Sequence, residues 1–306
     1  MTDPTSPAPV VVGLDGSADA WAAAELAAEE ARRRGAPVEL LFAFPWPEGA
    51  RVAAPEGFDG RAAMHVMAEL VLETAVDTLR RRVPGLTVGS RMHVGAAPDV
   101  LVAASRSAQL LCVGSRSSGS IDDVVLGSTA SAVARHAACP VLVVPLRAGS
   151  TVTGRSGVVV GVDGPEDDPV LDAAFDAAEA RDCGLVAVHT WRHPFPGAAH
   201  VVLDPLIGAD AAQRRQESLL DDLLTSRTTR RPDVPVRRVV EQARAADVLL
   251  SAALTAELLV VGRHHRPGGP LGTLRSTTNA VLHRAGCPVE VVPGAGPAEA
   301  GRPGAR

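Results

Sequence analysis

The chain repeats itself after 148 residues, and this internal repeat constrains its fold more than any other feature of the sequence. Residues 10–16 read VVVGLDG and residues 158–164 read VVVGVDG, while residues 114–145 align with residues 262–293 at the same offset without a gap. In a chain of 306 residues this predicts a tandem duplication of one domain, since a single domain usually holds about 100–200 residues. We place the two domains at residues 9–147 and 156–294, with residues 147–156 as the linker.

Short apolar runs alternate with helical patterns in each copy. Such alternation predicts a parallel sheet with helices on both faces. The expected fold class is therefore α/β, with two tandem, doubly wound, five-stranded parallel-sheet domains of the Rossmann-like type. The expected strands are residues 10–14, 38–44, 86–94, 110–113 and 141–144 in the first copy, and 158–162, 185–190, 234–240, 258–261 and 289–292 in the second.

Composition excludes several classes of function. Lysine is absent, so the 30 cations are all arginine, and neither a P-loop nor a Schiff-base lysine exists. A net charge of −5 without a basic run argues against nucleic-acid and anionic-membrane partners. The four scattered cysteines predict reduced thiols rather than a disulfide framework. With no apolar run long enough for a bilayer and no leader pattern, we expect a soluble, cytoplasmic protein.

Ligand-type residues follow the first and fourth strands of the first copy. In an open parallel sheet, ligands bind beyond the carboxyl ends of the strands, where the strand order reverses. Asp15 follows the first strand, and a loop rich in glycine and serine begins at Gly114. We expect a helix to begin near Gly127, capped by Ser128 or Thr129, with free N–H groups that attract an anion. The alternatives are that Asp15 only caps the following helix and that the glycine loop is an ordinary turn.

At these residues the sequence resembles the universal stress protein family, and the resemblance covers residues 9–293. The ATP-binding branch of that family carries G-x2-G-x9-G-[ST] after the fourth strand and an Asp after the first. Gly114, Gly127, Ser128 and Asp15 match this pattern, and Ser117 stands at the second glycine. The resemblance implies adenosine contacts from Gly13 and Asp15, loop contacts from Val113, Gly114, Ser115 and Ser117, and phosphate contacts from Gly127, Ser128 and Thr129.

The second copy departs further from the same motif. Asp163, Gly262, Ser276 and Thr277 match it, but His265 and Arg275 stand at the second and third glycines. An added side chain at either position hinders close approach of the backbone to phosphates. We therefore predict an intact site in the first domain and a degenerate one in the second.

These observations favour a nucleotide-binding regulator of the stress response over an enzyme, with ATP, accompanied by Mg²⁺, as the cofactor. Two alternatives stay open, namely a structural or interaction protein that binds no nucleotide and a slow ATPase. The apolar terminal strands, residues 141–144 and 289–292, predict that the two domains pair within the chain, because pairing would cover exposed edges. A homodimer is also open.

Other candidate groups are weaker. His189, His193 and His200 are interpreted as surface-loop histidines rather than a metal site. Cys139 and Cys287 precede proline at matched positions and are interpreted as small buried hydrophobes. Asp122 and Asp123 are candidates for holding Mg²⁺ on a bound nucleotide, although solvated loop carboxylates are the commoner case.

Overall fold

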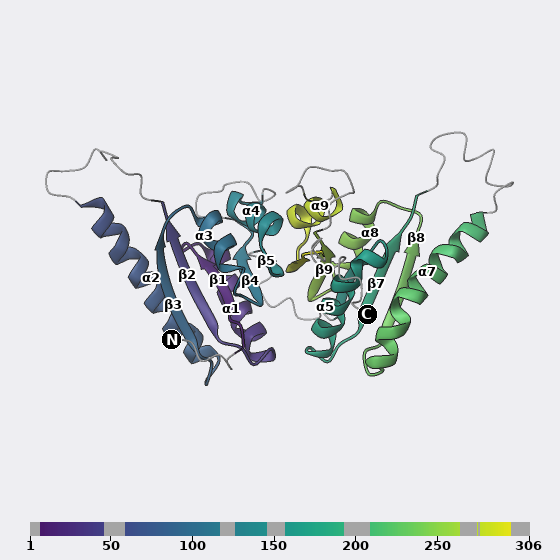
Figure 1. Ribbon diagram of the computed structural model, residues 1–306, viewed down its shortest axis with the longest axis horizontal. Coiled ribbons are helices and arrows are strands. Elements are labelled where there is room, and N and C mark those ends of the chain that lie inside the picture. Colours follow the sequence, from purple (N-terminus) through teal and green to yellow (C-terminus); the bar gives the residue numbers. More distant parts are fainter. Residues whose placement is uncertain are drawn as a thin grey trace, which may run out of the picture. The chain divides into compact units, whose positions relative to one another are not determined.

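The computed structural model describes residues 7–45, 59–116, 126–145, 157–192, 209–263, 274 and 276–294. The chain divides into two compact units, Met1–Thr151 and Val152–Arg306. Figure 1 traces the elements of each unit along the chain, from purple at the N-terminus to yellow.

The first unit alternates strands and helices throughout its described part. Its five strands are β1 (Val10–Leu14), β2 (Val38–Phe44), β3 (Val88–Val94), β4 (Leu110–Gly114) and β5 (Val141–Val144). The helices between them are α1 (Ala18–Arg33), α2 (Gly60–Arg82), α3 (Ala97–Ala104) and α4 (Ser128–His136).

The second unit follows the same order. Its strands are β6 (Val158–Val162), β7 (Leu185–Thr190), β8 (Val236–Glu241), β9 (Leu258–Gly262) and β10 (Val289–Val292). Its helices are α5 (Asp168–Glu179), α7 (Ala209–Arg230), α8 (Ala245–Ala252) and α9 (Ser276–Arg284), and a short 3₁₀ turn, η2 (Pro165–Asp167), precedes α5.

The strands of each unit pair in parallel, in the order β3-β2-β1-β4-β5 in the first unit and β8-β7-β6-β9-β10 in the second. In the first unit α1 and α2 cover one face of the sheet while α3 and α4 cover the other; in the second unit α5 and α7 lie opposite α8 and α9. The predicted fold class is thereby confirmed. The strand order reverses between β1 and β4 and between β6 and β9, which is where a ligand crevice is expected.

Central strands buried on both faces explain the near-continuous valine runs. All of β5 is buried, as are four of the five residues of β1. Helix α1 is rich in alanine, and Ala23, Ala24 and Ala27 are fully buried against the sheet. Ser17 caps this helix by accepting a hydrogen bond from the Ala20 amide at 3.2 Å.

Several sequence-based interpretations of single residues can be compared with the structure. Cys139 and Cys287 are buried, as expected of small hydrophobes. The expected cap of α4 by Ser128 or Thr129 is wrong, because the N-cap residue is Gly127 and no side chain bonds there. Pairing of β5 with β10 stays a prediction. No described helix is both long and apolar enough to cross a bilayer.

Candidate functional site

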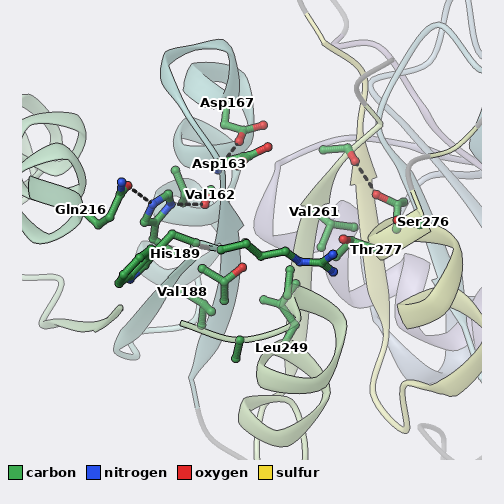
Figure 2. A pocket seen from close by; sticks show the side chains of 18 of the residues that line it. Val162, Asp163, Asp167, Val188, His189, Gln216, Leu249, Val261, Ser276 and Thr277 are labelled. Carbon is green, nitrogen blue, oxygen red and sulfur yellow. Dashed lines mark hydrogen bonds between the residues drawn. The ribbon is translucent and has the colours of Figure 1, made fainter. Parts of the chain in front are cut away.

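The second unit holds a pocket of about 640 Å³ beyond the carboxyl ends of β6, β7 and β9. This volume lies within the range of about 300–1,000 Å³ that is usual for small-molecule sites. Figure 2 shows His189 and Gln216 on one side of the pocket and Ser276 and Thr277, at the start of α9, on the opposite side. The lining includes Asp163, Gly262, Ser276 and Thr277, so the structure brings all four sequence-predicted residues of this half together.

His189 contributes an imidazole to the wall of this pocket. The residue is only 3% exposed, and its Nδ1 lies 2.9 Å from the Val162 carbonyl oxygen. A carbonyl can only accept, so Nδ1 carries a proton, and Nε2 lies 2.9 Å from Oε1 of Gln216. The interpretation of His189 as a surface-loop histidine is therefore wrong. His193 and His200 lie outside the described residues.

Trp191 is fixed beside His189 by a second glutamine of α7. Its indole N–H donates to Gln213 Oε1 at 2.9 Å, and the Gln213 amide nitrogen donates to Glu217 Oε1 at 2.9 Å and to the Val240 carbonyl at 3.1 Å. The Trp191 backbone amide donates to the Glu241 carbonyl at 3.1 Å. Because ring and backbone are both anchored, this aromatic surface of the pocket has a defined orientation.

Two carboxylates and a helix start complete the described wall. The buried Asp167 accepts from the Asp163 amide at 2.6 Å, which ties the turn after β6 to η2. Thr278 donates its hydroxyl hydrogen bond to the Gly262 carbonyl at 2.8 Å and so fastens the first turn of α9 to the end of β9. His265 and Arg275, the two departures from the motif, lie outside the described residues.

The first unit has a much smaller pocket at the matching place. Its volume is about 60 Å³. Of the sequence-predicted residues, its lining brings together Gly13, Asp15, Val113, Gly114, Gly127 and Thr129. Ser115 and Ser128 are not part of this lining, and Ser117, Asp122 and Asp123 lie outside the described residues.

Asp19 engages Ser115 and Arg116 beside the first pocket. Asp19 is 5% exposed, and its Oδ2 accepts from the Ser115 hydroxyl at 2.8 Å and from the Arg116 amide at 3.1 Å. Arg116 Nε lies 3.3 Å from the same oxygen. A buried carboxylate that gains such charge-assisted hydrogen bonds is well satisfied. Sequence reasoning missed Asp19, although an aspartate 148 residues later, Asp167, was a visible signal.

Close packing explains why glycine is needed at two of the positions for which the resemblance implies a nucleotide contact. A Cβ on Gly114 would lie 2.7 Å from the backbone of Asp19, so α1 can approach β4 only where a side chain is absent. A Cβ on Gly13 would lie 2.9 Å from the Leu101 side chain. Asp15 likewise has a local role, since its Oδ1 accepts from the Ser17 amide at 2.9 Å. These three residues therefore have structural reasons that do not depend on a ligand.

No metal centre is visible in the part of the chain that the structure describes. None of its His, Cys, Asp and Glu side chains form a group of three or more that could hold an ion.

Comparisons with known proteins give a consistent result. The model of the "Universal stress protein family" matches residues 8–145 and 155–293. A universal stress protein of Mycolicibacterium smegmatis is 34% identical over 291 residues, covering 92% of this chain and 96% of its own. The crystal structure of a universal stress protein from Archaeoglobus fulgidus has a TM-score of 0.65 at 19% identity and covers 94% of this chain and 96% of its own, a likeness of fold. A universal stress protein solved in complex with cAMP is 26% identical, with a TM-score of 0.36, over 46% of this chain and 98% of its own.

Proposed function

Because the chain belongs to the universal stress protein family, we propose that it binds an adenine nucleotide, ATP, at the carboxyl ends of its parallel strands and acts as a nucleotide-responsive regulator of a stress response. One observation carries this proposal. The pocket of about 640 Å³ gathers Asp163, Gly262, Ser276 and Thr277, the residues that match the nucleotide motif in the second half. The first amides of a helix have no partner within the helix, so the start of α9, with hydroxyls beside it, suits a phosphate.

Binding without rapid turnover is the second part of the proposal. Hydrolysis needs a base within reach of the attacking water. His189 supplies the imidazole of the larger pocket, but both of its ring nitrogens are engaged, by the Val162 carbonyl and by Gln216. We therefore expect a kcat below about 1 s⁻¹, the lower end of the usual enzyme range.

The motif and the pocket volumes favour different halves of the chain. By residue type the first unit keeps more of the motif, with Gly114, Gly127 and Ser128 in place. By volume the second unit has about 640 Å³ against about 60 Å³. Either half is compatible with nucleotide binding by the chain as a whole.

The test is to denature the purified full-length protein and identify any released nucleotide by mass spectrometry, followed by calorimetric titration of the nucleotide-free protein with ATP and Mg²⁺. Release of an adenine nucleotide, or saturable ATP binding, is the expected result. Absence of both would contradict the proposal. A kcat for ATP hydrolysis within the range of about 1–10³ s⁻¹ would assign the chain to the enzymes instead.

An interaction role without nucleotide is the second candidate, and one surface favours it. On α2, Val66 and Leu70 are each 64% exposed and lie one helical turn apart, with Met67 beside them. Adjacent exposed apolar side chains of this kind often mark a contact surface. This role would become the leading one if no nucleotide bound.

A further inference from the structure

The second pocket contains a polar arrangement for which the fold itself gives no reason. Gln213 and Gln216 lie three residues apart on α7, so they share one face of the helix. Gln213 holds the indole of Trp191, and Gln216 holds the imidazole of His189. Two side chains of one helix thus fix two aromatic rings on one wall of the pocket (Figure 2, where Gln216 and His189 are labelled).

The first unit builds the same sheet without this arrangement. Val162 pairs with His189 in the register of β6 with β7, whereas Leu14 pairs with Phe42 in the register of β1 with β2. The residue 148 positions before Gln216 is Ala68, which is fully buried. Burying polar groups is unfavourable unless each finds a partner. Phe42 and Ala68 suffice for the fold in the first unit. The polar pair at the corresponding positions of the second unit, His189 and Gln216, therefore indicates a function in the pocket.

The chemistry of the wall defines the class of ligand. Trp191 presents an aromatic surface whose orientation is set, and Val188, Leu249 and Val261 add apolar area around it. Arg192 adds a cation to the lining, and the start of α9 brings Ser276 and Thr277. A flat heteroaromatic group that carries an anionic arm fits both parts, because aromatic rings stack on bases and cations bind phosphates.

We infer that the second unit is the principal nucleotide site of the chain and that Trp191 is the surface on which the base stacks. This inference rests on the proposed function and names the half that performs it. The motif alone predicts the opposite, namely that the first unit binds ATP more tightly than the second. The first unit is the weaker site because its pocket holds about 60 Å³.

Tryptophan fluorescence tests this directly, because the chain has only three tryptophans, Trp21, Trp46 and Trp191. The full-length variant Trp21→Phe/Trp46→Phe keeps Trp191 as its single tryptophan. Titration with ATP and Mg²⁺ is expected to quench its emission with the midpoint that calorimetry gives for the same variant. A stacked base quenches the ring, whereas a nucleotide bound only in the first unit leaves Trp191 unchanged.

Matched substitutions at Trp191 separate stacking from a structural role. Trp191→Ala is expected to weaken ATP binding at least tenfold, while Trp191→Phe, which keeps a ring, is expected to recover most of the affinity. Trp21→Phe, in the other unit, is the control and is expected to bind ATP like the wild type. Circular dichroism identifies any variant that fails to fold, in which case the single-tryptophan titration decides alone.

The outcomes distinguish the two proposals. Saturable ATP binding without a change in Trp191 emission, and with unchanged affinity in Trp191→Ala, would overturn the inference and leave the proposed function standing. If Trp191→Ala and Trp191→Phe weakened ATP binding equally, this would also count against stacking. If ATP does not bind the full-length wild type at all, the proposed function fails, and the inference fails with it.

Discussion

At the scale of single residues, Asp19 places a negative charge beside the loop that follows β4. Its carboxylate engages the Ser115 hydroxyl and the Arg116 amide, which follow β4. Phosphates approaching the same loop would meet a like charge in a partly buried setting, where screening by solvent is weak. Asp19 is thus an internal anion beside the loop that follows β4.

Asp19→Asn should therefore improve ATP binding by the first unit. The amide oxygen keeps an acceptor for Ser115 while the charge is removed. We expect calorimetry to reveal a second site, with the first unit's affinity raised about tenfold or more, equivalent to about 1.4 kcal/mol. Asp77→Asn, an exposed change on α2 with the same loss of charge, is the control and should leave the titration unchanged. Identical titrations for Asp19→Asn and Asp77→Asn would contradict this account.

Cys183 offers a pH-dependent observable away from both pockets. Burial raises the pKa of its thiol, and the nearby Glu257 carboxylate raises the pKa further. Only the thiolate is a good nucleophile, so a raised pKa reduces the reactive fraction at neutral pH. We expect alkylation of Cys183 by iodoacetamide to reach its half-maximal rate at a higher pH in the native protein than in the urea-unfolded chain. Peptide mapping measures the alkylation rate of Cys183 in the native and in the unfolded chain. Coinciding pH profiles would show that the folded environment does not shift the pKa of this thiol.

At the scale of elements, the approach of α1 to β4 depends on the absence of a side chain at residue 114. Gly114→Ala would place a Cβ 2.7 Å from the backbone of Asp19 and push the helix from the strand. Overpacking of this kind costs about 1–3 kcal/mol. Gly89→Ala in β3 is the matched control, since the nearest atom to its Cβ is the Val38 carbonyl oxygen at 4.0 Å, and its effect should stay within about 0.5 kcal/mol. Urea unfolding compares the two, and equal stability would refute the packing explanation.

Most elements could be predicted from the sequence because their signals are local. The strands β1, β2 and β5 and their counterparts β6, β7 and β10 have the predicted bounds, since short buried apolar runs end at turn residues. Helix α3 ends at Ala104, because Ser105 to Ser107 form turns before β4.

The candidate site was less predictable because its contacts join distant parts of the sequence. Asp19 and Ser115 are 96 residues apart, and His189 meets Gln216 across 27 residues, so neither contact follows from a local pattern. A weak signal did exist for His189, a polar residue within the otherwise apolar run LVAVHT. The motif glycines were found correctly as special positions, yet for Gly13 and Gly114 the structure supplies a packing reason.

At the scale of the whole molecule, the prediction that the two units pair through β5 and β10 can be tested with separate chains. Residues 1–151 and 152–306, the bounds of the two units, would be co-expressed with a tag on one of them. Apolar edge strands are stabilised by pairing, so we expect the untagged unit to co-purify with the tagged one. The double variant Leu142→Arg/Val291→Arg, with one change in each strand, should abolish the association. Retention of the untagged unit by this double variant would exclude the two strands as the contact.

The presence of two separate cores has a consequence for how the protein responds to heat. Each unit has its own paired parallel strands and its own set of fully buried leucines, including Leu40 and Leu110 in the first and Leu185 and Leu258 in the second. A ligand stabilises only the cooperative unit that binds it, by about 2.7 kcal/mol at a hundredfold excess over Kd. Scanning calorimetry should therefore resolve two heat-absorption peaks, of which ATP moves one to higher temperature and leaves the other in place. A single peak that shifts as a whole would instead show that the two halves unfold together. With two peaks, the melting temperature of one half would report the nucleotide concentration, and that of the other half would serve as an internal reference.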